Sequence, residues 1–248
     1  MKPVRQRGLG LVELMVGITV GLIVTAGASI MAVNQINEHR RLMLETQVQQ
    51  DLRTAADLLQ QDLRRAGYRG YAQLGVWAPP AAVGSVGEQP AAMPSANQFT
   101  DVAKVEDGDF RALTYMYART LPNTVDYSPT GTPRDVEHFG FKWDKNTKTL
   151  YLQIGVANDR PNWQPITDPD SVRITAFEVN IDDSQSVSVG DFCDKPCDTP
   201  GTSACPRHVV REVSFTIVGE AAHDAKVKRT LTGSERLRTD KISGACPA

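Results

Sequence analysis

Residues 7–33 read RGLGLVELMVGITVGLIVTAGASIMAV, and this stretch decides the fold of the chain. From Leu14 to Val33 it contains 20 residues without a charge, about the length that a helix needs to cross a bilayer. One acid, Glu13, stands at the start of the apolar run, and the chain after Glu38 is polar enough to be soluble. The sequence therefore predicts a single N-terminal membrane helix followed by a soluble region.

The residues before the apolar run carry Lys2, Arg5 and Arg7 and no acid. Positive charge beside a hydrophobic span keeps that end in the cytoplasm, so we expect the C-terminal region on the periplasmic side of a bacterial inner membrane. The net charge of −2 gives no electrostatic reason to expect a nucleic-acid partner.

Three interpretations of this N-terminus compete. It is a secretory signal peptide with Ala26 and Ala28 as an A-x-A cleavage site, a plain membrane anchor, or a prepilin leader. A carboxylate in an apolar segment costs about 2.5–3.5 kcal/mol near the helix centre and less toward its edge. Neither a signal peptide nor a plain anchor needs such a residue, so Glu13 favours the third interpretation.

The segment RGLGLVEL, residues 7–14, resembles the prepilin peptidase motif, in which a Gly ends a short basic leader and a Glu follows in the mature chain at the spacing of Gly8 and Glu13. The resemblance implies cleavage between Gly8 and Leu9 by prepilin peptidase and N-methylation of Leu9. It also implies that Glu13 pairs with the amino terminus of a neighbouring subunit and sets the axial register. Leu9 departs from the Phe or Met that is usual at the first mature position.

The helix is expected to continue beyond the membrane, because no proline occurs between Pro3 and Pro79. Apolar residues recur there at helical spacing, at Leu44, Val48, Leu52, Ala55, Leu59, Leu63 and Ala66. This pattern predicts a helix from about Leu9 to Ala66, with Gly67 as its C-terminal stop. The stripe favours a globular domain packed on the helix over a coiled-coil seam.

Downstream of a Gly- and Pro-rich loop over residues 68–97, the chain has the alternation typical of strands. Strands are expected at residues 110–118, 139–143, 149–156, 172–181, 209–218 and 226–231, with a hairpin turn over 144–148. A helix followed by successive strands predicts an α+β fold with an antiparallel sheet on the helix. The expected divisions are a leader (1–8), a transmembrane helix (9–33), a periplasmic amphipathic helix (34–67) and a globular head (68–248).

The segment DLRRAGYRG, residues 62–70, resembles the helix end of PilW-type minor pilins, and GspJ-type pseudopilins of type II secretion have a related helix end. Major pilins usually carry a proline where this chain has Ile30, which also favours a minor pilin or a pseudopilin.

The resemblance implies a structural subunit that primes type IV pilus assembly at or near the tip and supports twitching motility and adhesion. The alternative is a subunit of a type II secretion pseudopilus. The implied partners are prepilin peptidase, other minor pilins, the major pilin, the inner-membrane assembly platform and a tip adhesin.

The chain has four cysteines, Cys193, Cys197, Cys205 and Cys246. An even number in an oxidising compartment predicts two disulfides that stabilise the C-terminal region, and three pairings remain open. A zinc site with four thiolate ligands is the disfavoured alternative.

No catalytic motif is present, since the four histidines are scattered and there is no P-loop. We therefore expect a protein that is not an enzyme and that holds no cofactor or metal. The acids Asp182, Asp183, Asp191 and Asp194 are a weak calcium candidate, and solvated loop acids are the favoured interpretation.

Overall fold

The computed structural model describes residues 10–70, 97–119, 133–193, 205–239 and 241–244. The chain divides into two compact units, Met1–Gln47 and Val48–Ala248. Helix α1, Leu11–Leu63, supplies its N-terminal part to the first unit and its C-terminal part to the second. Most of the expected loop over 68–97 lies outside the described residues.

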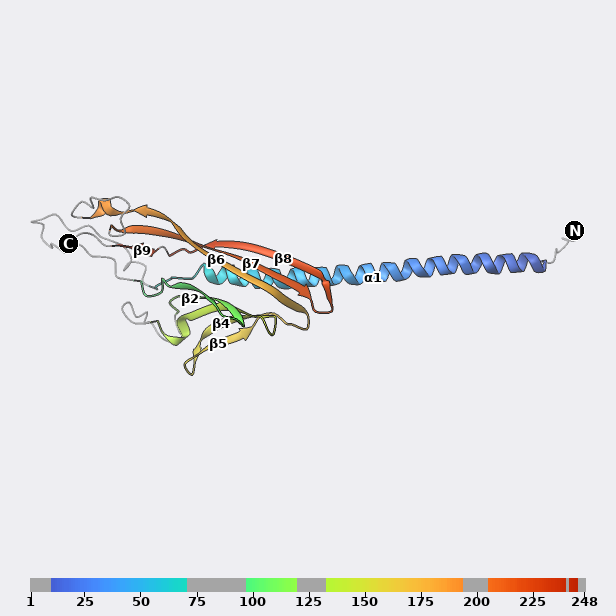
Figure 1. Ribbon diagram of the computed structural model, residues 1–248, viewed down its shortest axis with the longest axis horizontal. Helices are drawn as coiled ribbons and strands as arrows, with labels where there is room; N and C mark the ends of the chain where they lie inside the picture. The colour runs from blue at the N-terminus through green and yellow to red at the C-terminus, as the bar shows by residue number, and fades with distance from the viewer. Residues whose placement is uncertain (1–9, 71–96, 120–132, 194–204, 240, 245–248) are drawn as a thin grey trace, which may run out of the picture. The chain divides into compact units, whose positions relative to one another are not determined.

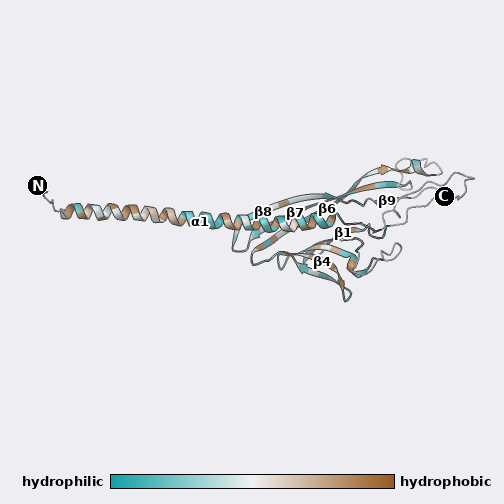
Figure 2. Ribbon diagram, turned by 180° about the vertical axis from the view of Figure 1, so that it is seen from behind, coloured by the Kyte–Doolittle hydropathy of each residue, from teal (hydrophilic) through white to brown (hydrophobic). Residues whose placement is uncertain are grey.

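The first unit contains the N-terminal part of α1, in which the uncharged stretch from Leu14 to Val33 is apolar on every side. Large side chains such as those of Leu11, Ile23 and Met31 are 72–75% exposed. Figure 2 shows this stretch as a helix with little hydrophilic colour. Among the described residues, α1 is the helix whose length and apolar composition suffice to cross a membrane. Apolar side chains that are exposed along a whole helix need a lipid or protein environment.

In the second unit, α1 turns one apolar face toward the sheets. The expected stripe is confirmed there, because Val48, Leu52, Leu59 and Leu63 are at most 1% exposed. Figure 1 shows this part of the helix running along β6, β7 and β8. Helical stability in water comes mainly from packing such an amphipathic face, so the sheets fix this part of the helix.

The helix ends at Leu63, three residues before the expected end at Ala66. The last turn tightens, since the amide of Ala66 donates to the carbonyl of Leu63 at 3.0 Å. Gly67 then takes φ +81°, as a glycine after a helix often does, and its amide donates to the carbonyl of Met116 at 2.8 Å. The chain therefore leaves the helix directly onto strand β2.

The first sheet is a five-stranded antiparallel meander in the order β1-β2-β3-β4-β5. Its strands are β1 (Val102–Glu106), β2 (Phe110–Met116), β3 (His138–Asp144), β4 (Thr149–Ala157) and β5 (Arg160–Pro165). The expected strands at 110–118, 139–143 and 149–156 correspond to β2, β3 and β4. The hairpin turn is also confirmed, since Asp144 pairs with Thr149.

The second sheet is antiparallel as well, in the order β6-β7-β8, with β9 paired to the start of β7. Its strands are β6 (Val172–Ser188), β7 (Arg207–Ala221), β8 (Asp224–Arg236) and β9 (Lys241–Ser243). Two short 3-10 helices, η2 (Asp135–Glu137) and η3 (Gly190–Phe192), complete the described elements. The described residues of the head thus form two sheets where the sequence predicted one, and the α+β class is confirmed.

The core lies where both sheets meet the C-terminal part of α1. Leu113, Tyr115 and Phe141 of the first sheet and Phe177 and Ile217 of the second are at most 1% exposed. The sheets also join directly, because the indole Nε1 of Trp143 donates to the carbonyl of Ile174 at 3.0 Å in a buried position.

Candidate assembly helix and its attachment to the sheets

Glu13 lies in the first turn of α1, which opens with the amide of Leu14 donating to the carbonyl of Gly10 at 3.1 Å. The partial positive charge at a helix N-terminus favours an acid in this turn. The side chain is exposed, so its carboxylate is accessible to a second chain. Gly8 and Leu9, the expected cleavage and methylation positions, lie outside the described residues.

The other polar side chains of the apolar stretch are satisfied inside the helix. The hydroxyls of Thr19, Thr25 and Ser29 donate to the carbonyls of Val16, Gly21 and Thr25 at 2.8–2.9 Å. These bonds matter because an unpaired polar group is costly in hydrocarbon. Glu13 differs, since it makes no hydrogen bond with any described residue. Glu13 is therefore a polar side chain of this stretch without a hydrogen-bond partner among the described residues.

Asp62 attaches the end of α1 to the first sheet. Its two carboxylate oxygens accept hydrogen bonds from the hydroxyls of Tyr115 at 2.5 Å and Tyr117 at 2.9 Å. The ring of Tyr117 stacks on that of Phe139, with centroids 3.8 Å apart. Burial, and next the charge of Asp62, raise the pKa of both tyrosine hydroxyls, so these groups stay protonated as donors. The helical periodicity of the sequence gave no signal for this contact.

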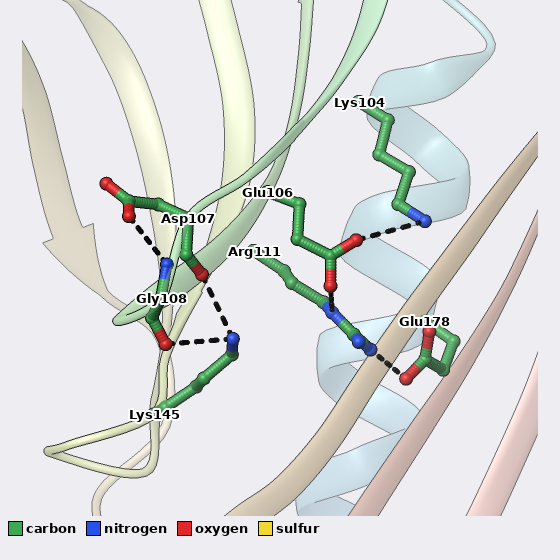
Figure 3. A network of polar contacts seen from close by, with 7 residues as sticks. All are labelled: Lys104, Glu106, Asp107, Gly108, Arg111, Lys145 and Glu178. Atoms are coloured by element: carbon green, nitrogen blue, oxygen red, sulfur yellow. Dashed lines mark hydrogen bonds and ion pairs between the residues drawn. The ribbon is translucent and has the colours of Figure 1, made fainter.

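A polar network joins the first sheet to β6 (Figure 3). Arg111 of β2 donates through Nε to Glu106 of β1 at 2.6 Å and through Nη1 to Glu178 of β6. Lys104 adds a contact to Glu106 at 3.6 Å. The hydrogen bond from Arg111 is the main cause that lowers the pKa of the Glu106 carboxyl. No sequence signal identified these residues, because ion pairs between distant strands follow only from the tertiary arrangement.

Next to this network, Lys145 connects the β3–β4 turn to the β1–β2 turn. The ammonium group of Lys145, in the β3–β4 turn, donates to the carbonyls of Asp107 and Gly108 in the β1–β2 turn at 3.0 Å each (Figure 3). The carboxylate of Asp107 meanwhile accepts from the amide of Gly108 at 2.5 Å. These contacts and the Arg111 bridge serve the stability of the head.

Neither a metal cluster nor a free thiol is found in the part of the chain that the structure describes. No group of three His, Cys, Asp or Glu side chains is placed to hold a metal ion there. Asp182 and Asp183, from the weak calcium candidate, lie in strand β6 and not in a loop, and the carboxylate of Asp182 accepts a hydrogen bond from the amide of Ser184 at 2.9 Å. Asp194 lies outside the described residues.

Cys193 and Cys205 are both in the disulfide-bonded form. Cys197 and Cys246 lie outside the described residues, so the pairing and its contribution to stability stay predictions.

Comparisons with known proteins agree with this arrangement. Residues 4–29 match the prokaryotic N-terminal methylation motif, and residues 41–237 match the family described as prepilin peptidase-dependent protein B. No curated protein and no solved structure matches the chain. The first match, over residues 4–29, includes most of the apolar stretch, while the second covers more than half of the chain. The chain belongs to the prepilin peptidase-dependent protein B family and is a type IV pilin-like subunit.

Proposed function

We propose that this protein is a minor pilin of the PilW type, a structural subunit that primes type IV pilus assembly at or near the tip and supports twitching motility and adhesion. The observation that carries the proposal is the N-terminal helix. It combines the methylation motif, an apolar surface exposed on every side and one acid, Glu13, that makes no hydrogen bond with a described residue. A subunit that leaves the membrane for a fibre needs each of these features, because its lipid contacts must be replaced by neighbouring helices.

In this proposal, residues 1–8 are the leader and residues 9–33 cross the inner membrane, with residues 34–67 and the head in the periplasm. Prepilin peptidase cuts between Gly8 and Leu9, and Leu9 is then N-methylated. The other partners are the major pilin, further minor pilins, the inner-membrane assembly platform and a tip adhesin. The protein performs no catalysis itself.

Glu13 then acts through charge. Cleavage leaves a positive amino terminus on Leu9, one helical turn from Glu13, and the same pair exists on every subunit of a fibre. A carboxylate in an apolar environment is costly alone and is tolerated when it is paired. A neighbouring amino terminus meets that need at one axial position, so the ion pair selects the register between subunits.

The leader is tested by mass spectrometry of the mature N-terminus. The expected result is a chain that starts at N-methylated Leu9. A chain that starts after Ala28 would instead show a secretory signal peptide, and the pilin role would be wrong.

The role is tested by deletion of the gene with complementation. Loss of surface pili and of twitching, with normal exoprotein secretion, is the expected outcome. Loss of exoprotein secretion with intact pili would identify the second candidate, a type II secretion pseudopilin, which the sequence of the helix end at residues 62–70 supports.

A further inference from the structure

Strand β8 leaves one long edge of the second sheet open. It has 13 residues and pairs with β7 on one side, whereas no described strand pairs with its other side. The amide of Leu237 donates to the carbonyl of Arg211, so these two residues form a hydrogen-bonded pair. The next pair, Glu212 and Arg236, is then not hydrogen-bonded. Because hydrogen-bonded pairs alternate along an antiparallel ladder, the backbone groups of Thr230, Thr232 and Ser234 point away from β7.

Two other sheet edges are protected in ways that natural proteins use against strand pairing. Strand β5 carries prolines at both Pro161 and Pro165, and β1 is only five residues long with charged side chains. Strand β6 meets the first sheet at Ile174, whose amide donates to the carbonyl of Lys148 at 2.8 Å. Strand β8 differs from β5 and β1 because it is long and carries no proline.

A hollow lies beside this edge, between α1 and β8. Its volume is about 240 Å³, and it is lined by Gln49, Leu52 and Arg53 from the helix and by Arg229, Thr230 and Leu231 from β8. A second hollow of about 490 Å³ lies over β6, β7 and β8, and its lining includes Thr216 and Thr232. The hollow beside the edge gives space to a side chain of an added strand.

The charge of this edge selects the partner. Strand β8 carries four cations, at Lys226, Lys228, Arg229 and Arg236, and two acids, Asp224 and Glu235. Glu220 and Glu212 of β7 lie directly opposite Lys228 and Arg236, while Arg64 of α1 pairs with Glu235 at 3.1 Å. Arg53 adds a further positive charge in the hollow. The cations around this edge still outnumber the acids, so an added strand is favoured when it carries carboxylates.

A second copy of the chain gains no net charge complementarity at this edge. Antiparallel pairing of two β8 strands about Thr232 would place Lys228 of one copy opposite Arg236 of the other, and Arg229 opposite Glu235. The like-charge pairs destabilise such a dimer and the opposite-charge pairs stabilise it, so the two effects offset each other, whereas an acidic strand meets the cations without like-charge pairs. We propose that the open edge of β8, from Lys228 to Arg236, binds an extended acidic segment of a different protein by strand addition. This inference concerns the head alone and does not depend on the role of the N-terminal helix.

The experiment measures binding of a short labelled peptide that alternates valine with glutamate to the full-length protein in detergent micelles, by fluorescence anisotropy. The variant Thr232→Pro removes an outward-facing amide and leaves the ladder to β7 intact, since proline is tolerated at such edge positions. We expect its affinity for the peptide to fall by about tenfold or more.

The matched control is Lys104→Pro on β1. The amide of Asp107 donates to the carbonyl of Phe110 at 2.9 Å, so the next pair along the ladder, Glu106 and Arg111, is not hydrogen-bonded. Lys104 lies two residues before Glu106, so its amide also faces away from β2. This variant should bind the peptide as the wild type does, and melting followed by circular dichroism checks that both variants are folded.

A second probe does not depend on any protein variant. The same peptide with N-methylated backbone amides cannot donate to the edge, and the same peptide with lysine for glutamate lacks the complementary charge. Both should bind the wild-type protein about tenfold more weakly or worse. Equal binding of all three peptides, no binding of the acidic peptide, or an equal loss in Lys104→Pro would overturn the proposal. So would a dimer in sedimentation that Thr232→Pro dissociates, because the occupant would then be a second copy.

Discussion

The hydroxyl of Tyr115 donates to the carboxylate of Asp62 at 2.5 Å, which connects the last turn of α1 to the second strand of the first sheet. Tyr115 is 1% exposed, so the bond is made away from water. A hydrogen bond to a charged group in such a place is worth more than one at the surface. The end of the helix is thereby fixed on the head by a polar contact as well as by its apolar face.

The change Tyr115→Phe should destabilise the head by about 1–3 kcal/mol, because one oxygen of Asp62 loses its donor while the ring stays in place. Chemical denaturation of the full-length protein in micelles, followed by near-UV circular dichroism, measures the difference. Tyr151→Phe, on β4, is the control and should change little. An unchanged midpoint for Tyr115→Phe would show that the contact does not contribute.

The head should lose stability in alkali. Burial and Asp62 raise the pKa of the Tyr115 hydroxyl well above 10.0, its ordinary value. A group whose pKa is raised on folding contributes stability that is fully present below its unfolded pKa and is lost as the pH rises through the folded value. The midpoint of unfolding should therefore fall from about pH 10 upward. In Tyr115→Phe this fall should be smaller, and an equal slope in both proteins would contradict the assignment.

The ion pair between Arg111 and Glu178 joins β2 to β6, so a substitution of either residue should remove the same contact. A double-mutant cycle with Arg111→Ala and Glu178→Ala should give a coupling of about 0.5–1 kcal/mol, since the Glu178 side chain is 54% exposed and solvent screens the pair. The coupling should shrink in high salt. Strictly additive single-mutant effects would mean that the two side chains do not interact in solution.

Glu13→Val should leave membrane insertion intact and lower incorporation into pili, because the neighbouring amino terminus loses its counter-charge. The assay is immunoblotting of sheared pili against the membrane fraction. Glu38→Ala is the matched control, since Glu38 is an exposed acid on the same helix beyond the apolar stretch and should not affect incorporation. Wild-type levels of Glu13→Val in the sheared fraction would refute the register role.

The cysteines should all be oxidised in the mature protein. A non-reducing mass map is expected to show two disulfides among Cys193, Cys197, Cys205 and Cys246, and removal of one bridge should cost about 2–4 kcal/mol. The pairing follows from the same map. Four free thiols would contradict the prediction and would reopen the zinc alternative.

The predicted strands with clear alternation are present because one face of each is buried. Leu113 and Tyr115 on β2 and Val213 and Phe215 on β7 alternate with more exposed neighbours, so pattern alone found them. Strands β1, β5 and β9 were missed. They are short edge strands, exposed or rich in proline, and their conformation depends on the strand beside them.

Strand β6 shows that part of a strand is also missed where the sequence lacks a clear alternating pattern. The sequence predicted residues 172–181, but the strand continues to Ser188 through the polar segment DDSQSVS. Nothing in that segment favours a strand. It becomes one because Gln185 and Ser188 pair with Val210 and Arg207 of β7.

By itself, the sequence determined the N-terminal helix, its apolar surface, the acid at its start and the buried stripe of its second half. These features depend on local composition and on a period of 3.6 residues, which are present in the chain before it folds. Only the tertiary structure decided that the described strands form two sheets, that Asp62 meets Tyr115 and that no described strand pairs with the outer edge of β8. Each of these depends on which distant segments lie side by side, and the local sequence pattern does not specify those contacts.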